Sequence, residues 1–562
     1  MYESIDYCWM DMTNEDITLV EQLFEDEDFP LQEMAAAIAS KFYYHLEQYE
    51  DAVEFALFSG KYFNLEEKSE YVDTIVAKCI DAYVEKRKKM YAAENDAREE
   101  DEEEDAETSR SLEAVVERMF ERCYEDRQNM QALGIALEAR RLDQVEAAIL
   151  RSDDVSELLD FCFDFCRLHV PHRGFRQTVL QILAKLYRNH CATPDYVNVC
   201  QCLQFLGDAK GVADVLLNLI RKDGEERGAL VAYQVAFRIY ENENQQFMRD
   251  IIDALPRVVA AESADAAKTN EGDEADAAGK DSDLSPDTRA RLETLVKVLD
   301  GRTTMKIHLD FLCSNNRTDL LILRKMKNSF QRNSVLHNAV VVAHAYMNCG
   351  TTQHTFLRDN EQWLMKATNW ARFTAIGGIG VVHKGHVDNP LQLLDPYLPK
   401  TEADNNSKPF CEGGAYYALG LIHANKGWTD GGKIVDFLLE RVKGSRNPTV
   451  LHGACLGLSC AAMASGSSEI TAALNKALLN LDDAVAGEAA AYGLGLLNVG
   501  RGQDAASEIE RMLAYAHETK HEKIIRGLSL GVGLIMYGQE EIADALIEQM
   551  LRDRDHIVRY GG

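Results

Sequence analysis

One stretch decides the fold: GGAYYALGLIHANKG, residues 413–427. It is flanked by polar turns and has the composition of a single helix, yet it carries Gly414 and Gly420 among its apolar residues. A glycine inside a helix costs about 1 kcal/mol relative to alanine. Close packing against a second helix can offset that cost, because the missing side chain lets the two axes approach and gain dispersion contacts. The stretch therefore predicts a helix that packs tightly against others of its kind.

The same pattern occurs in four other helices. When these helices are aligned on the second small residue of the pattern small–apolar–small–apolar, the matched positions are Gly380, Gly420, Ser459, Gly495 and Gly533. Successive positions are 40, 39, 36 and 38 residues apart. Such regular spacing indicates a repeat array.

Each repeat continues with a polar turn and a second, ordinary amphipathic helix, such as VDFLLERVKG (435–444) and ADALIEQMLRD (543–553). One layer of helices is then closely spaced and the other more widely spaced. This difference predicts a curved array, and strong curvature could close such an array into a ring.

The composition narrows the class of protein. The 562 residues carry 60 basic and 92 acidic side chains, a net charge of −32, and 46% are hydrophobic. This surplus of acid argues against nucleic acid and anionic membranes as partners, because both require cations to neutralise phosphates. The acidic start MYESIDYCWMDM is unlike a secretory signal, and no run of about 18 apolar residues predicts a membrane span. The 13 scattered cysteines are typical of reduced thiols, so we expect a protein of the cytoplasm and nucleus with protein partners.

Apolar residues at intervals of three and four run along nearly the whole chain, which favours an all-α fold. Helix pairs such as QALGIALEARRLDQVEAAIL (131–150) are expected to stack as a solenoid. Residues 260–289 are acidic and poor in large apolar side chains, so we expect them to be a disordered linker. This linker divides a predicted organisation of four parts. The four parts are a helical rod at 1–259 with an acidic loop at 93–109, the linker at 260–289, a continuation of the rod at 290–365, and the repeats at 366–562.

Three groups of residues resemble chemical motifs. GWTDGGKI (427–434) nearly fits a phosphate-binding loop, but Ile434 stands where Ser or Thr must ligate Mg²⁺, and the segment follows a helix instead of a strand. We interpret it as a turn between helices. Cys162 and Cys166 share a helix face, but no second pair has the spacing of a zinc site, so these are predicted to be core thiols. His383 and His423 are interpreted as packing or turn residues. We therefore expect no catalytic, cofactor-binding or metal-binding residues.

The repeat helices also carry a resemblance to a known family. The stretches are NWARFTAIGGIGVVHKGH (369–386), EGGAYYALGLIHANKG (412–427), HGACLGLSCAAM (452–463), GEAAAYGLGLLNVG (487–500) and HEKIIRGLSLGVGLIMYG (521–538). They resemble the proteasome/cyclosome repeats, and most closely the family of 26S proteasome regulatory-particle non-ATPase subunit 1, the larger repeat-bearing scaffold of the 19S base. Stretches upstream, such as NCGTTQHTFLRDN (348–360), match as well, so the resemblance covers nearly the whole chain.

The resemblance implies an α-solenoid rod followed by an α-toroid of these repeats, acting as a non-catalytic scaffold without a cofactor. Its implied partners are the ATPase ring, lid subunits and ubiquitin receptors. Two departures limit what is carried over. A sixth repeat position is expected about 38 residues after Gly533, beyond Gly562, so the toroid is expected to be incomplete. The family's C-terminal region, which docks a ubiquitin receptor, has no counterpart in the sequence, and Ser459 replaces the usual repeat glycine.

Two other hypotheses remain. The chain could be a scaffold of another large complex with the same repeats, either the sister base subunit 2 or the largest subunit of the anaphase-promoting complex. It could also be a nucleotide hydrolase that acts through residues 427–433. The proteins recovered with the chain from cells would distinguish a proteasomal scaffold from one of the anaphase-promoting complex. Replacement of Lys433 would test the hydrolase hypothesis.

Overall fold

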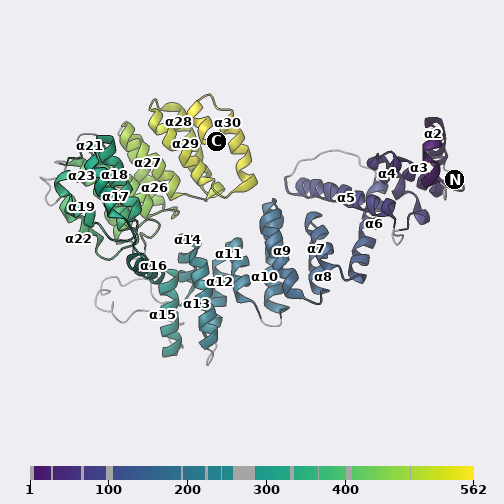
Figure 1. The fold of residues 1–562 in the computed structure, drawn as a ribbon, viewed down its shortest axis with the longest axis horizontal. Helices are drawn as coiled ribbons and strands as arrows, with labels where there is room; N and C mark the ends of the chain where they lie inside the picture. Colours follow the sequence, from purple (N-terminus) through teal and green to yellow (C-terminus); the bar gives the residue numbers. More distant parts are fainter. Residues whose placement is uncertain are drawn as a thin grey trace, which may run out of the picture. The chain divides into compact units, whose positions relative to one another are not determined.

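The computed structural model describes residues 5–26, 29–64, 69–96, 106–191, 194–221, 226–241, 244–256, 285–329, 334–364, 366–399, 408–428, 431–480 and 483–562. Every regular element in these ranges is an α-helix or a short 3-10 helix, so the predicted all-α fold is confirmed (Figure 1). No helix in these ranges is both long and apolar enough to cross a membrane. The chain divides into two compact units, residues 1–206 and 207–562, which are described separately.

The first unit is a series of antiparallel helix pairs. Neighbours such as α3 and α4, α7 and α8, and α10 and α11 pack on each other. Of the predicted acidic loop at 93–109, the two ends are helical, and residues 97–105 lie outside the described residues. The helices are α1 (Ile5–Cys8), α2 (Asn14–Glu25), α3 (Gln32–His45), α4 (Tyr49–Leu57), α5 (Glu70–Asp96), α6 (Ala106–Glu125), α7 (Asn129–Glu138), α8 (Leu142–Leu150), α9 (Val155–His169), α10 (Arg173–Asn189) and α11 (Tyr196–Leu206), with 3-10 turns at Trp9–Asp11 and Gly60–Tyr62.

Arg141 ties three helices of this unit together at the turn between α7 and α8. Its guanidinium donates hydrogen bonds to the Tyr83 hydroxyl of α5 at 2.8 Å, to Glu117 of α6 at 2.6 Å, and to Asp143 of α8 at 2.8 and 2.6 Å. The hydrogen bonds and the positive charge of Arg141 lower the pKa of the Asp143 carboxyl. The Tyr83 ring is buried and the Arg141 side chain is 13% exposed, whereas the Glu117 and Asp143 carboxylates on the outer side of the contact reach solvent.

The second unit begins with helices that the sequence pattern assigns to the rod. They are α12 (Ala209–Arg221), α13 (Glu226–Glu241), α14 (Gln245–Ala254), α15 (Pro286–Leu299), α16 (Arg302–Ser314) and α17 (Leu320–Ser329). Most of the linker predicted to be disordered, residues 260–284, lies outside the described residues. The prediction is wrong for residues 286–289, because α15 begins at Pro286. Ser285 caps that helix by accepting a hydrogen bond from the Thr288 amide at 3.2 Å, and proline suits the first helical position.

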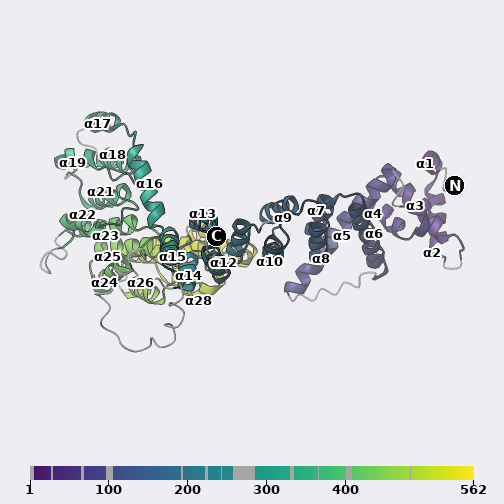
Figure 2. The same ribbon diagram turned by 90° about the horizontal axis from the view of Figure 1, so that it is seen from below.

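The repeats form two layers, seen from two directions in Figures 1 and 2. In the glycine layer, each helix packs on the next in chain order. Its members are α18 (Ser334–Met347), α21 (Asn369–Val382), α23 (Pro409–Ile422), α25 (Pro448–Ala461), α27 (Ala484–Leu497) and α29 (Glu522–Ile535), followed by the short α31 (His556–Gly561). The second layer holds α19 (Thr355–Asp359), α20 (Glu361–Leu364), α22 (Pro390–Leu394), the 3-10 helix η4 (Asp395–Tyr397), α24 (Lys433–Gly444), α26 (Ser468–Asn480), α28 (Ala506–Glu518) and α30 (Asp544–Leu551), with 3-10 turns at Gly502–Ala505 and Glu540–Ala543.

The glycine layer begins one helix earlier than the sequence pattern indicates. Helix α18 lies in the range 290–365, which the sequence predicts as a continuation of the rod, yet it packs on α21 as the later members pack on each other. A Cβ atom built on Gly378 of α21 would lie 3.3 Å from the Ala345 Cβ of α18. One contiguous hydrophobic core includes residues from Leu323 to Val558 and therefore extends across all the repeats.

Arg141 provides a test of the first unit. We expect Arg141→Met to lower the free energy of unfolding by about 1–3 kcal/mol, because it leaves the buried Tyr83 hydroxyl without its charged hydrogen-bond donor. Urea melts of the full chain, followed by circular dichroism, would measure the change. The matched control is Arg127→Met, whose pair with Asp153 is about 80% exposed, and which should change stability by less than about 0.5 kcal/mol. Equal effects of the two substitutions would contradict the prediction.

Candidate functional site

Gly414 and Gly420 of the opening stretch face opposite neighbours. A Cβ atom on Gly414 would lie 2.8 Å from the Phe373 carbonyl oxygen of α21. A Cβ atom on Gly420 would fall well inside 3.0 Å of the Gly457 Cα of α25, a distance that real Cβ atoms essentially never show. Helix α23 thus touches the backbone of the helix on each side. This double contact is the close approach that the glycines make possible.

The structure buries four of the five matched positions between helices. A Cβ on Gly380 would lie 2.6 Å from the Ala418 Cα, and Gly495 faces the Gly531 Cα in the same way as Gly420 faces Gly457. Ser459 is fully buried, and its hydroxyl is satisfied because it donates to the Cys455 carbonyl of its own helix at 2.7 Å.

Gly533 differs from the other matched positions, because it is exposed. A Cβ atom on Gly533 would have the Gly561 carbonyl oxygen as its nearest neighbour, at 3.8 Å, which is an ordinary contact distance. The next helix in the layer, α31, has six residues and packs instead on Ser529, one turn earlier in α29.

Sequence reasoning missed the partners of these glycines. A Cβ on Gly453 would overlap the Gly413 carbonyl of α23, and one on Gly457 would overlap the Tyr416 carbonyl. Gly453 and Gly457 are four residues apart and therefore lie on one helix face. A search for two small residues four apart, in addition to the aligned pattern, would have found this second contact face.

Backbone hydrogen bonds join consecutive repeats at the ends of these helices. The loops after α18, α21, α23, α25 and α27 each donate an amide N–H to a carbonyl in the last turn of the next helix of the layer. The last carbonyls of a helix have no partner within that helix, so these bonds satisfy groups that would otherwise need water. The bonds are Thr352 to Val382 at 3.0 Å, Gly385 to Ile422 at 2.9 Å, Gly427 to Ala461 at 3.1 Å, Gly466 to Leu497 at 3.0 Å and Gly500 to Leu534 at 3.1 Å.

A reciprocal pair of cation–π contacts joins α13 and α14 to the turn after α23. The Lys426 ammonium lies 4.4 Å from the ring centre of Tyr240 and donates a hydrogen bond to its hydroxyl. The Arg249 guanidinium lies 4.7 Å from the ring centre of Trp428. Each side of this joint therefore supplies one cation and one aromatic ring. Gly301 packs against the Tyr240 ring, where a Cβ atom would lie 2.5 Å from the ring edge.

Burial lowers the pKa of both cations in this joint, that of Lys426 to about 8. The aromatic rings offset part of that cost, because a desolvated cation–π contact is stronger than an exposed one. The arrangement holds the rod helices α13 and α14 against the turn after α23.

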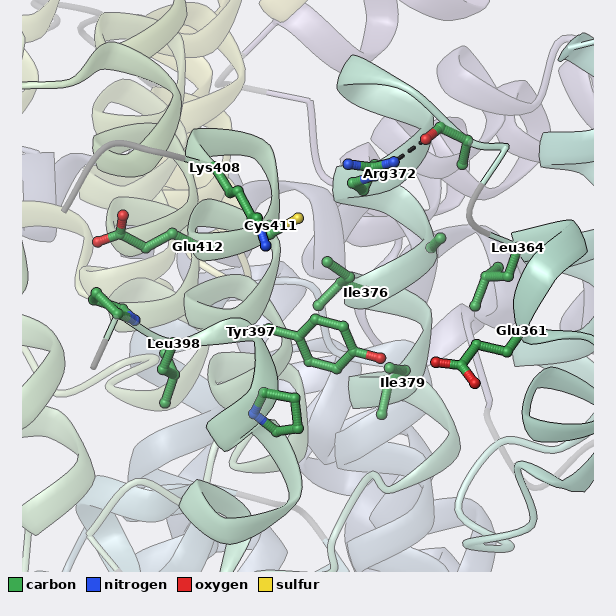
Figure 3. A pocket seen from close by; sticks show the side chains of 14 residues that line it. Glu361, Leu364, Arg372, Ile376, Ile379, Tyr397, Leu398, Lys408, Cys411 and Glu412 are labelled. Carbon is green, nitrogen blue, oxygen red and sulfur yellow. Dashed lines mark hydrogen bonds between the residues drawn. The ribbon is translucent and has the colours of Figure 1, made fainter. Parts of the chain in front are cut away.

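A cavity of about 750 Å³ lies beside the first repeats, lined by α20, α21, the η4 turn and the start of α23 (Figure 3). Its floor is apolar and includes Leu364, Ile376 and Ile379, and the Tyr397 ring lies across it. Burial, together with the charge of Glu361, raises the pKa of the Tyr397 hydroxyl. The volume of the cavity falls within the range of pockets that bind small ligands or the anchor side chain of a peptide.

The charged residues of this cavity lie at different sides of it. Arg372 is fixed by donating a hydrogen bond to the Ala367 carbonyl at 3.1 Å, and the Lys408 side chain points into the space (Figure 3). Glu361 lies at the opposite side, and the Glu412 carboxylate turns away from the cavity, toward Tyr416, from whose hydroxyl it accepts a hydrogen bond at 3.0 Å.

The residues that resemble chemical motifs occupy structural positions. The segment 427–434 connects α23 to α24, with Gly431 and Gly432 at positive φ and Lys433 opening the second helix. It thus lacks the strand that a phosphate-binding loop follows. Cys162 and Cys166 are fully buried, which raises the pKa of both thiols. Among the described residues, no group of three or more His, Cys, Asp or Glu side chains is arranged to hold a metal ion.

The two repeat histidines occupy the same place in successive repeats. His423 is buried, and its Nδ1 lies 2.9 Å from the Leu419 carbonyl oxygen. His383 is 5% exposed, and its Nε2 lies 3.1 Å from Nδ1 of His354. Burial, with added repulsion from His354 and His386, lowers the pKa of His383 to about 4. His383 is therefore neutral in the folded protein at ordinary pH.

The comparison with protein families gives this architecture a name. The family model described as 26S proteasome subunit RPN2, N-terminal domain, matches residues 1–316, more than half of the chain. The chain belongs to the RPN2 family. This result agrees with the resemblance carried by the repeat helices.

Relatives extend the RPN2 match to the rest of the chain. The 26S proteasome non-ATPase regulatory subunit 1 homolog A of Arabidopsis thaliana is 43% identical, and the alignment covers 99% of this chain and 56% of the relative. The Drosophila melanogaster subunit 1 is 40% identical over 99% of this chain and 56% of its own. The Schizosaccharomyces pombe regulatory subunit rpn2 is 38% identical over 100% and 55%. The chain thus spans about half the length of these relatives.

Among solved structures, a crystal structure of a Kap121p mutant aligns with all of this chain and 54% of its own, at 13% identity and a TM-score of 0.29. That likeness is too weak to carry any argument.

The glycine contacts of this RPN2-family chain give a direct stability prediction. We expect Gly420→Leu to lower the free energy of unfolding by about 1–3 kcal/mol or more, because the leucine side chain would clash with the main chain of α25 and force the two helices apart. Denaturant melts of the full chain would measure it. Gly533→Ala, at the exposed position of the same layer, should leave stability unchanged or raise it by up to about 1 kcal/mol. An unchanged midpoint for Gly420→Leu would contradict the close approach.

The buried histidine predicts how stability depends on pH. The unfolded chain binds a proton at His383 near pH 6.5, but the folded chain binds it only near pH 4. The free energy of unfolding should therefore fall as the pH drops below about 6.5, and this contribution should level off near pH 4. His383→Asn introduces the residue type that Asn498 supplies at the matched place in a later repeat. The free energy of unfolding should therefore fall less between pH 7.5 and pH 5 in His383→Asn than in the wild type, by up to about 2 kcal/mol.

Urea melts at the two pH values would measure this difference. His308→Asn changes an exposed histidine of α16 and serves as the control, which should keep the wild-type dependence. Identical pH dependence in His383→Asn and the wild type would contradict the prediction.

Proposed function

We propose that this chain is a non-catalytic scaffold subunit of the base of the proteasome 19S regulatory particle. It would organise contacts of the lid, the ATPase ring and ubiquitin receptors for ubiquitin-dependent degradation. The RPN2 family supports the proteasomal assignment, and its relatives are named regulatory subunits. The observation that supports a scaffold is the glycine layer, in which backbone contacts make consecutive repeats one continuous body.

The physical role of such a body is to hold binding surfaces at fixed positions. The glycine contacts and the loop-to-helix hydrogen bonds restrain each repeat against the next, and the cation–π joint restrains the rod helices α13 and α14 against the repeats. A partner that binds one repeat is thereby held relative to a partner on another. Restraint before binding reduces the ordering entropy that assembly costs.

The nucleotide-hydrolase hypothesis lacks support from the geometry, because residues 427–434 join two helices and Ile434 offers no magnesium ligand. The two alternative scaffolds, base subunit 2 and the anaphase-promoting-complex subunit, are not supported, because the family model that matches the chain is that of RPN2. We further propose that the chain acts in the cytoplasm and nucleus, where fluorescence microscopy of a tagged chain would locate it.

Affinity purification tests the proposed function. A tagged chain expressed in its own cells should recover proteasomal ATPases and lid subunits, identified by mass spectrometry. Lys433→Ala should recover the same set, because the residue opens an ordinary helix in the proposed scaffold. Recovery of anaphase-promoting-complex subunits without ATPases, or of no proteasomal subunit, would overturn the proposal.

A further inference from the structure

We propose that two neighbouring pockets between the first repeats form one docking track for an extended acidic peptide segment of a partner protein. The inference rests on the proposed scaffold function in one respect only, which is that a scaffold needs docking sites. It assigns the chemistry of one such site.

The two pockets lie next to each other because they share a wall. The first is the 750 Å³ cavity between α21 and α23, and Glu412 is among its lining residues. The second, of about 280 Å³, lies between α23 and α25 beside the end of α24, and Glu412 lines it as well. Glu412 is buried and lies between the two pockets, so an extended chain that fills both would cross over this residue.

The first pocket is suited to an apolar anchor. Leu364, Ile376, Ile379 and Leu398 line it together with the Tyr397 ring (Figure 3). Burial of an aliphatic or aromatic side chain against such a surface is favourable, because apolar area is removed from water. A few buried anchors of this kind supply most of the binding energy of protein interfaces.

Among the described residues, cations without a carboxylate partner line both pockets. Lys408, Arg441 and Arg446 line the pockets, and within the described part of the chain none of their side chains forms an ion pair with a carboxylate. The Arg441 Nε is buried without a hydrogen-bond acceptor, and its guanidinium lies 4.9 Å from the ring centre of Phe437, which restrains its position. In a chain of net charge −32, unpaired cations at one place favour an anionic ligand.

The carboxylates present define what kind of anion fits. Glu361 lies across the first pocket, Glu412 is engaged by Tyr416, and Glu440 lines the second pocket. A dense polyanion such as a nucleic acid would be repelled by these groups and by the charge of the whole chain. A peptide with an apolar anchor, followed by a few separated carboxylates, can place its charges beside the cations alone. The ligand class is therefore an acidic, extended peptide segment.

Fluorescence polarisation with the purified full chain tests this proposal. The probe is a fluorescein-labelled octapeptide with two leucines followed by four aspartate and glutamate residues. We expect saturable binding with a Kd of about 1–100 μM that weakens with added salt. Replacing the leucines by serine should weaken binding about tenfold or more, and replacing the acidic residues by lysine should abolish it.

Variants of the exposed cations locate the binding. Arg446→Glu and Lys408→Glu should each weaken binding of the acidic probe about tenfold. Lys433→Glu makes the same charge change at the other end of α24 and should leave binding unchanged. Circular dichroism melts would show that each variant remains folded.

Three results would overturn the inference: no binding of the acidic probe at ~1 mM, equal binding of the lysine peptide, or full binding by the folded Arg446→Glu and Lys408→Glu variants. The two proposals fail separately. A chain that recovers proteasomal ATPases but does not bind the probe refutes only the docking track. A chain that binds the probe but recovers no proteasomal subunit refutes only the proposed function.

Discussion

Contact between the backbones of neighbouring helices is the constraint on which the second unit depends. At Gly420 and Gly457 no side chain of any size fits, so the spacing of α23 and α25 is set by main-chain atoms. Main-chain contacts cannot adjust by changing a rotamer, and close-packed interiors transmit small displacements instead of absorbing them. The second-layer helices, which pack through larger side chains, are added to a layer whose geometry is already fixed.

The loop-to-helix hydrogen bonds act in the same direction. They join the end of each glycine-layer helix to the end of the next, while the glycine contacts lie along the helix bodies. Two sets of contacts at different heights resist both sliding and tilting of one helix on another. The repeats are thus held by directional as well as by non-directional forces, which is what a body that positions several partners requires.

Local sequence pattern was enough to predict the features that depend on neighbouring residues. Interior glycines carry a cost that demands a close neighbour, so Gly380, Gly420 and Gly495, and Ser459 at the matched place, could be identified as packing positions from the sequence alone. The same argument was wrong for Gly533, which is exposed. Helix α18 was missed because its packing residue is Ala345, and alanine is common in any helix. The cation–π joint could not be foreseen, because Lys426 and Tyr240 are 186 residues apart and neither belongs to a periodic pattern. The proposed docking track could not be foreseen either, because it brings together residues from α20 to α25 whose contact depends on the tertiary fold.

The reciprocal joint has an evolutionary consequence. Replacing Tyr240 alone would remove the ring that faces the buried Lys426, and replacing Lys426 alone would leave a polar hydroxyl and a void in the same place. The same holds for Arg249 and Trp428. Drift on one side of the joint is therefore penalised until a compensating change arises on the other. Across descendants of this chain, the four positions should change together, as linked pairs, or hardly change.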